Sequence, residues 1–359
     1  MKKLTMILLT GLLVLGLVAC GGGTTDPTTP STPADEGSKG LAYELNGSTI
    51  TITGIGTCTD TVVKIPKTID GNKVTAIGKV DAVAGAGAFS GNASIKEVVI
   101  PKGVQYVNSY AFENCTALET VTIPDSVKEL GEGAFVGCTA LKTVTADPIG
   151  MSIVGDSAFK GCTSLTALNL PVSVTKIGAS AFENCENLAT VNITDEMILG
   201  WHVLHGTAFF NDESNWENDA LYFGNHLLAV KDTIGNVFHI KDGTVDIVGD
   251  VFAGLDITEV YIPDTIKRIG REAFADCTKL ARIELGEGVG VIDDYAFKGC
   301  TILSFIQIEK NLSVIGVGAF DGCDTLKQIN FRGPTAQWKS IDNKANTGRF
   351  DIYCTDAWA

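Results

Sequence analysis

The dipeptide Ala-Phe recurs along this chain at a nearly constant interval. The Phe-to-Phe steps are 23, 23, 24 and 23 residues up to Phe182, and 23 and 23 residues again from Phe274. A fixed period of this length is typical of a solenoid, in which each unit stacks on the next. Seven of the eight Phe residues have a Cys three positions later. The copies are Ala88-Phe89, Ala111-Phe112, Ala134-Phe135, Ala158-Phe159, Ala181-Phe182, Ala273-Phe274, Ala296-Phe297 and Ala319-Phe320.

One complete unit spans residues 118–138, with the sequence LETVTIPDSVKELGEGAFVGC. Its start, Leu-x-x-Val-x-Ile, predicts a short strand in which Val121 and Ile123 point to the same face. Pro124 ends the strand because it cannot donate to a ladder. Gly131 marks a turn, and Ala-Phe-x-x-Cys is expected to return as a helical or 3-10 turn. A single unit cannot bury its apolar residues, so stacked units are expected to form a parallel sheet with strands about 4.8 Å apart.

This unit resembles the leucine-rich repeat of the BspA-like surface antigens, also called the Treponema-type repeat. The resemblance covers residues 41–354. It implies a leucine-rich-repeat solenoid with short parallel strands on one face, turns or short 3-10 and helical segments on the other, and β-hairpin caps. Members of this family include adhesins, so the resemblance is more specific for the fold than for a ligand.

The repeats need closing ends and are interrupted once. We predict an N-terminal cap at 41–88, beginning with a hairpin around the Asn46-Gly47 turn, a C-terminal cap at 331–354 and a tail at 355–359. Between Cys185 and Phe274 the pattern breaks, and residues 195–250 are interpreted as one enlarged, irregular repeat. Ala208-Phe209 and Val251-Phe252 are interpreted as diverged copies of the motif. The alternative is two solenoid lobes with a bend near residues 195–235.

The first twenty residues have the order of an export signal. Lys2 and Lys3 precede an apolar run that ends at Leu17-Val18-Ala19-Cys20. These last four residues resemble the lipobox of bacterial lipoproteins, which implies a signal peptide at 1–19 and lipidation of Cys20. Residues 20–40, rich in Gly, Thr and Pro, are predicted to be a flexible tether. An uncleaved membrane helix is the alternative. The expected location is therefore outside the cell, lipid-anchored to the bacterial membrane and exposed at the cell surface.

The ten cysteines and the net charge narrow the possible functions. Seven cysteines occupy one inward position of the repeat, so we interpret them as small, reduced core residues, with disulfides between neighbouring units as the alternative. The formal net charge of −15 argues against a nucleic-acid partner. Membrane attachment would depend on the lipid at Cys20 rather than on surface charge.

No catalytic motif is recognisable in the sequence, so no enzyme activity and no cofactor are predicted. All four histidines lie in the break, at His202, His205, His226 and His239. His202-x-x-His205 could place two imidazoles together, but no further ligand spacing supports a metal site, and none is predicted.

The outward positions of the predicted sheet are the remaining candidates for a binding site. Before the break they are small and mostly neutral, and after it Tyr261, Arg282, Glu284 and Phe305 fall on neighbouring strands. Exposed aromatic residues with Arg are typical interface anchors, although they are also ordinary residues of a solvated sheet. Trp201 and Trp216 in the break are further candidates.

The leading hypothesis is a non-catalytic, adhesin-like protein that presents its solenoid to an extracellular protein or glycan. It follows from the anchor, the tether, the repeats and the lack of catalytic motifs. The alternative is a structural or assembly component of the cell envelope, with partners in the same cell.

Overall fold

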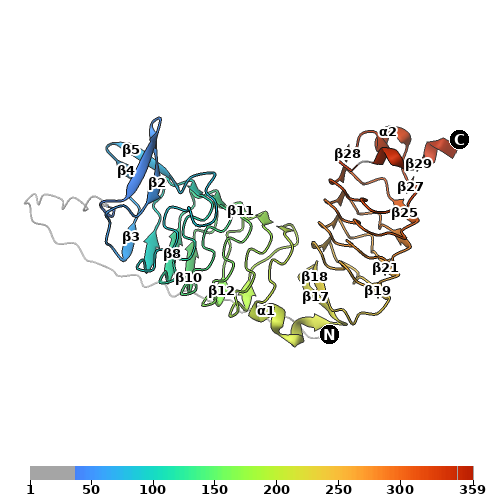
Figure 1. Cartoon of the computed structure of the whole chain (residues 1–359), viewed down its shortest axis with the longest axis horizontal. Helices are drawn as coiled ribbons and strands as arrows, with labels where there is room; N and C mark the ends of the chain where they lie inside the picture. Colours follow the sequence, from blue (N-terminus) through green and yellow to red (C-terminus); the bar gives the residue numbers. More distant parts are fainter. Residues whose placement is uncertain (1–36, 346, 359) are drawn as a thin grey trace, which may run out of the picture. The chain divides into compact units, whose positions relative to one another are not determined.

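A computed structural model of the chain describes residues 37–345 and 347–358. The predicted signal peptide, Cys20 and most of the predicted tether lie outside these residues. The described part is a solenoid of short parallel strands, and the predicted leucine-rich-repeat solenoid is confirmed (Figure 1). One apolar core runs through it from Leu41 to Cys354.

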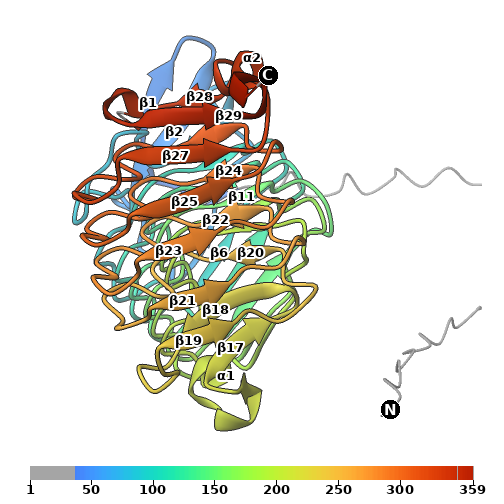
Figure 2. The same ribbon diagram turned by 90° about the vertical axis from the view of Figure 1, so that its right-hand side faces the viewer.

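The first strand of each repeat is the predicted Leu-x-x-Val-x-Ile strand, and these strands stack in register. Val121, for example, lies between Val98 and Val144 on the neighbouring strands. Figure 2 shows the C-terminal members, β19 to β29, stacked one above another. We call this ladder the first-strand face; it comprises β3 (Val62–Lys64), β6 (Glu97–Val99), β8 (Thr120–Ile123), β10 (Thr143–Ala146), β12 (Ala167–Leu168), β14 (Thr190–Val191), β19 (Val237–His239), β21 (Glu259–Tyr261), β23 (Arg282–Glu284), β25 (Phe305–Ile308), β27 (Gln328–Phe331) and β29 (Asp351–Cys354).

Each repeat also has a second, two-residue strand that the sequence did not lead us to expect. It forms where Val-x-x-Ile-Gly brings a second pair of residues into register with the next repeat, as Glu129-Leu130 does with Ile153-Val154. We call this ladder the second-strand face. In the repeats it comprises β5 (Asn72–Ile77), β7 (Tyr106–Val107), β9 (Glu129–Leu130), β11 (Ile153–Val154), β13 (Lys176–Ile177), β15 (Ile198–Leu199), β20 (Asp246–Ile247), β22 (Arg268–Ile269), β24 (Val291–Ile292), β26 (Val314–Ile315) and β28 (Asp342–Asn343).

Antiparallel hairpins start both parts of the second-strand ladder. The predicted N-terminal hairpin consists of β1 (Ala42–Asn46) and β2 (Thr49–Gly54), and β4 (Thr68–Ile69) pairs with β5 beside it. After the break, β16 (Trp216–Glu217), β17 (Ala220–Phe223) and β18 (His226–Val230) form a second antiparallel unit. β18 then pairs in parallel with β20, so this hairpin is the base on which the later repeats stack.

The Ala-Phe-x-x-Cys segment is a hydrogen-bonded turn rather than the predicted helical or 3-10 turn. In the seven copies that end in Cys, the residue before Ala and the residue before Cys both adopt the left-handed conformation, which a right-handed helix cannot contain. In one repeat these are Ser157, with φ 54°, and Gly161, with φ 73°. Helical segments are confined to the break and the C-terminal end, as α1 (Ala208–Asn211), η1 (Glu213–Asn215), α2 (Thr335–Trp338), η2 (Thr347–Arg349) and η3 (Thr355–Trp358).

The Phe and Cys of the motif form two parallel columns in the core. Phe112 and Phe135 are stacked with ring centroids 5.2 Å apart and planes 2° from parallel. The thiol of Cys138 lies 3.1 Å from the carbonyl oxygen of Phe112, one repeat earlier, and donates to it. All seven motif cysteines make this bond, so Cys fills a small apolar space and also supplies a donor. The nine described cysteines are unpaired, and burial raises the pKa of Cys115 to about 12.

Ala208-Phe209 is not a copy of the motif, contrary to our interpretation. The amide of Phe182 donates to the carbonyl of Val203, the same bond that Phe159 makes to Ala181. Val203-Leu204 therefore occupies the Ala-Phe place, which fits the repeat spacing, whereas Ala208 and Phe209 belong to α1. Val251-Phe252 does keep the motif, because the thiol of Cys277 bonds to the Phe252 carbonyl.

The folded body begins a few residues before the predicted start of the solenoid. The amide of Ser38 donates to the carbonyl of Lys64, and the Ser38 hydroxyl accepts from the Lys64 amide. These bonds cover the outer edge of β3, where an unpaired strand would be exposed. The last residues of the predicted tether are thus part of the fold.

Candidate functional site

Four of the candidate residues lie together on the first-strand face. Arg282 and Phe305 are opposite each other on β23 and β25, and the guanidinium carbon lies 4.1 Å from the centre of the Phe305 ring. Arg282 also donates to the carboxylate of Glu284 on its own strand. Tyr261 is on the adjacent strand β21 and remains 47% exposed. We call Tyr261, Arg282, Glu284 and Phe305 the aromatic–arginine patch.

The patch is held in place by its neighbours and surrounded by carboxylates. The ring of Tyr261 stacks on His239 at 4.1 Å, with planes 6° apart, because β19 and β21 pair there. A hydrogen bond to Glu259 raises the pKa of the Tyr261 hydroxyl. Tyr261, Arg282 and Glu284 line a shallow hollow of about 690 Å³. Its other charged lining residues are Glu259, Asp264, Glu287 and Glu309, so the hollow is strongly acidic.

The other two candidates, Trp201 and Trp216, lie in the break and away from the patch. Trp201 is 39% exposed and contacts His202 edge-on at 4.9 Å. Trp216 is half-buried, and its Nε1 donates to the Phe210 carbonyl at 2.9 Å. The Phe210 ring packs edge-on against it at 5.4 Å. Trp216 therefore holds α1 against β16, and only Trp201 presents a large free surface.

Side-chain bonds replace the strand ladder across the break, which we call the junction (residues 194–249). β15 ends one sheet and β16 begins the next. The guanidinium of Arg268 donates to the Leu199 carbonyl at 2.7 Å, where a following strand would otherwise pair. Asp195 likewise accepts from the side chain of Asn225 at the tip of the β17–β18 hairpin, at 2.7 Å. The repeats on either side are thus joined by polar side chains as well as by the core.

The centre of the junction is a buried charge network. Arg268 binds Asp246 through two hydrogen bonds of 3.0 and 2.9 Å and contacts Asp293 at 3.3 Å. His226, only 1% exposed, places Nδ1 3.3 Å from Asp246 and Nε2 3.0 Å from the Thr194 carbonyl. Both ring nitrogens face acceptors, so the doubly protonated imidazole satisfies both contacts.

The stability of the junction is expected to fall as the pH rises, because His226 binds a proton more tightly in the folded chain. Burial lowers its pKa, but the bonds to Asp246 and Thr194 and the charge of Asp195 outweigh burial, so the pKa lies above the ordinary histidine value of 6.5. Stability from this group is present below that unfolded value and is lost as pH rises through the folded pKa. Urea unfolding of wild type and His226→Gln between about pH 5.5 and pH 8.5 measures it.

The difference between wild type and His226→Gln in that experiment should shrink with rising pH. His202 also has a raised pKa, chiefly through its 2.8 Å contact with Asp250, but it is common to both proteins and cancels. A difference that stays constant or grows with pH would contradict a charged His226.

The remaining histidines do not assemble a metal site. The rings of His202 and His205 lie 5.1 Å apart, but Nε2 of His202 is already engaged by Asp250. Among residues 37–345 and 347–358, no group of three or more His, Cys, Asp or Glu is placed to hold a metal ion.

Comparison with known proteins identifies the repeat. The profile of the BspA type Leucine rich repeat region matches residues 83–212 and 236–348, in six copies. The chain belongs to this family. The two matched stretches leave only residues 213–235, inside the junction, unmatched between them. The resemblance suggested by the sequence is confirmed for the repeats.

Solved structures similar to this BspA-type protein include three bacterial proteins. A leucine rich cell surface protein from Faecalibacterium prausnitzii is 24% identical, with 88% of this chain and 99% of that chain covered and a TM-score of 0.42. The leucine rich repeat protein of T. pallidum is 22% identical, with 88% and 99% covered and a TM-score of 0.31. The pneumococcal vaccine antigen PcpA is 16% identical, with 89% and 98% covered and a TM-score of 0.30. No curated protein matched the chain.

The matched family is one of leucine-rich repeat proteins. Within the described ranges of this BspA-type protein, no helix is long and apolar enough to cross a bilayer. Sequence reasoning missed the Asp246–Arg268–His226 network. The only sequence signal was that Asp246 and Arg268 occupy equivalent positions of successive repeats. That signal could not be used because the second strands had not been predicted.

Proposed function

We propose that this protein is an exported, lipid-anchored surface protein that binds an extracellular protein or glycan without catalysing a reaction. The aromatic–arginine patch carries the proposal. It places a half-exposed tyrosine, an arginine over a phenylalanine and a carboxylate on three adjacent strands. Tyr and Arg are enriched among the residues that dominate binding energy at protein interfaces.

The charges around the patch indicate what kind of partner surface it fits. Glu259, Asp264, Glu287 and Glu309 surround it, and the whole chain carries a formal net charge of −15. A partner with basic groups beside an apolar centre would be attracted and oriented, whereas an acidic partner would be repelled. This favours a basic extracellular protein over a polyanionic glycan at the patch.

Export and anchoring follow from the N-terminal sequence. Leu17-Val18-Ala19-Cys20 after an apolar run implies cleavage before Cys20 and its acylation. Two or three acyl chains would hold the protein stably at a membrane. Incorporation of labelled palmitate into wild type, and its loss in Cys20→Ala, would test the anchor separately from binding.

Replacing Tyr261, Arg282 and Phe305 together with alanine is expected to weaken binding to the extracellular partner at least a hundredfold. Two anchor residues that each contribute about 1.5 kcal/mol already account for this factor. Pull-down of immobilised matrix proteins and mucin glycans identifies the partner, and surface plasmon resonance measures the change.

The matched control replaces three outward residues of the same face before the junction, Thr120, Thr143 and Thr190, with alanine. Equal binding by the patch variant and wild type would exclude the patch. Co-purification with envelope proteins of the same cell, together with no external partner, would instead favour a structural role in the envelope.

A further inference from the structure

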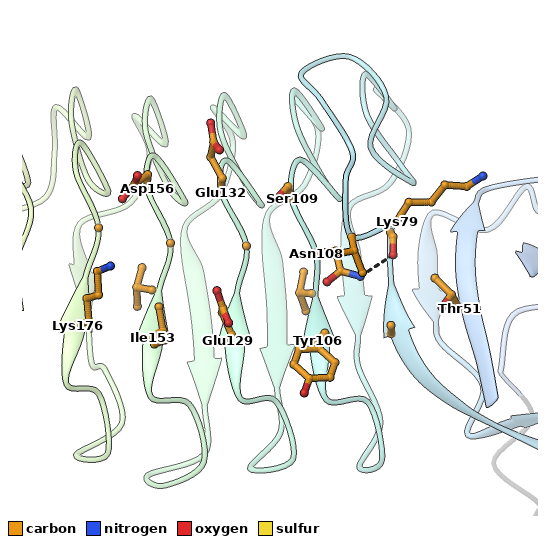
Figure 3. A pocket seen from close by; sticks show the side chains of 18 of the residues that line it. Thr51, Lys79, Tyr106, Asn108, Ser109, Glu129, Glu132, Ile153, Asp156 and Lys176 are labelled. Carbon is orange, nitrogen blue, oxygen red and sulfur yellow. Dashed lines mark hydrogen bonds between the residues drawn. The ribbon is translucent and has the colours of Figure 1, made fainter. Parts of the chain in front are cut away.

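A deep groove lies on the second-strand face, on the other ladder from the aromatic–arginine patch. It extends from the β1–β2 hairpin to β13 and has a volume of about 810 Å³. Figure 3 shows two rows of side chains along it, one with Tyr106, Glu129, Ile153 and Lys176, the other with Lys79, Ser109, Glu132 and Asp156. The second row follows the turn after each second strand.

The floor between the two rows is backbone, because the repeat packing leaves no room for side chains there. A Cβ on Gly131 would lie 2.5 Å from the Ser109 nitrogen, and one on Gly155 would lie 2.6 Å from the Leu130 oxygen. Gly178 is equally crowded by the Asp156 nitrogen, at 2.4 Å. The floor between the two walls therefore carries no side chains at these three positions.

Three groups along the groove are unengaged in the folded protein. The side chains of Tyr106, Glu129 and Lys176 form no hydrogen bond or ion pair with any described residue. They lie in register on β7, β9 and β13, with Ile153 between the last two on β11. The row from Tyr106 to Lys176 therefore spans about 14 Å, at about 4.8 Å per strand.

The backbone amides of the three floor glycines are already used between repeats. The Gly131 amide donates to the Val107 carbonyl at 2.7 Å, and the Gly155 amide donates to Leu130 at 2.9 Å. The Gly178 amide donates to Val154 at 2.8 Å. A ligand therefore finds no free donor in these glycine amides, and its hydrogen-bond donors in the groove are the side chains of the walls.

We propose that this groove binds an uncharged, linear oligosaccharide. Sugar rings have apolar faces that can pack on the half-exposed Tyr106 and on Ile153, and hydroxyls that can bond to Glu129, Lys176 and Asn108. Successive rings of an extended glycan advance by a distance similar to one repeat, so each strand can meet one sugar.

The charges select against acidic glycans. Glu44, Glu129, Glu132 and Asp156 face only Lys79 and Lys176 in the lining, and Lys79 is already paired with Glu44 at 2.6 Å. Sulfated or sialylated chains would therefore meet net negative charge. This inference concerns a second site and does not depend on the patch.

The test is binding of the folded full-length protein to linear uncharged glucose, galactose and N-acetylglucosamine oligomers, with heparin fragments as the acidic comparison. At least one uncharged series should bind, and Tyr106→Ala and Glu129→Ala should each weaken it about tenfold. Tyr43→Ala, a tyrosine of similar exposure outside the groove, is the matched control and should bind as wild type does. Both groove positions are exposed, so their variants should fold normally.

Binding of heparin alone, binding unchanged by both groove variants, or no binding of any uncharged oligomer would each overturn the assignment. The patch proposal is tested on a different ladder with other partners. If the patch variant loses protein binding but keeps glycan binding, both sites are supported. If the groove variants keep glycan binding while the patch variant loses protein binding, only the groove assignment fails.

Discussion

Replacing Phe135 with alanine is expected to lower the free energy of unfolding by about 3–5 kcal/mol, the usual loss for a buried aromatic side chain. Phe135 is fully buried and stacks between Phe112, at 5.2 Å, and Phe159, at 5.3 Å. The substitution removes contacts with both neighbours, and the stacked backbones cannot collapse into the space. Urea unfolding followed by circular dichroism measures the loss.

The loss of stability caused by Phe135→Ala should extend to the neighbouring repeats of the Phe column, because each repeat is stabilised mainly by its neighbours. The matched control is Ile149→Ala, in a loop of the same half, where the side chain is 62% exposed. Its free energy of unfolding should change by at most about 0.5 kcal/mol. A Phe135→Ala protein as stable as this control would show that the Phe column does not hold the repeats together.

The second large effect is expected at Arg268, where alanine should lower the free energy of unfolding by about 3 kcal/mol. The side chain is 15% exposed and its partner Asp246 is 6% exposed, so removal leaves a buried carboxylate with His226 as its remaining cationic neighbour. The Leu199 carbonyl also loses its donor. The buried Asp246 carboxylate and the Leu199 carbonyl both lie in the junction, so the loss of stability is local to it.

This local cost should alter the shape of the unfolding curve as well as its midpoint. With the junction weakened, the repeats before and after it should unfold in two separate steps. Trp201 and Trp216 lie in the junction, so their fluorescence would report the first of these two unfolding steps. The exposed pair Lys279 and Asp256 supplies the control, since Lys279→Ala should leave stability almost unchanged. A single, barely shifted transition for Arg268→Ala would contradict the role given to the network.

The sequence was most informative where one residue type repeats at one spacing. The Ala-Phe-x-x-Cys columns and the register of the first strands follow from a 23-residue period, because only stacking can bury such residues. The patch was also predictable, since strand register alone places Arg282 opposite Phe305. Its stack of Tyr261 on His239 was not, because β19 lies in the diverged segment.

The second-strand face escaped prediction for a physical reason. Its strands after β5 are two residues long, and their outward positions, Tyr106, Glu129, Ile153 and Lys176, share no chemical type. Their register comes from packing with the inward residues, such as Leu130 and Val154, rather than from any alternation visible in two residues. The groove and the charge network both depend on this ladder, so neither could be anticipated.

The junction would have a mechanical consequence for the proposed surface protein, held by its lipid anchor at one end and bound to a partner at the other. Parallel ladders between repeats resist sliding through many backbone bonds that must break together, whereas the junction relies on contacts such as Arg268 to Leu199 and Asn225 to Asp195. Under tension, these few bonds can open one after another while the stacked repeats stay intact. The chain would then lengthen at this point first, and the repeats on the far side could remain attached to their target while the load is absorbed.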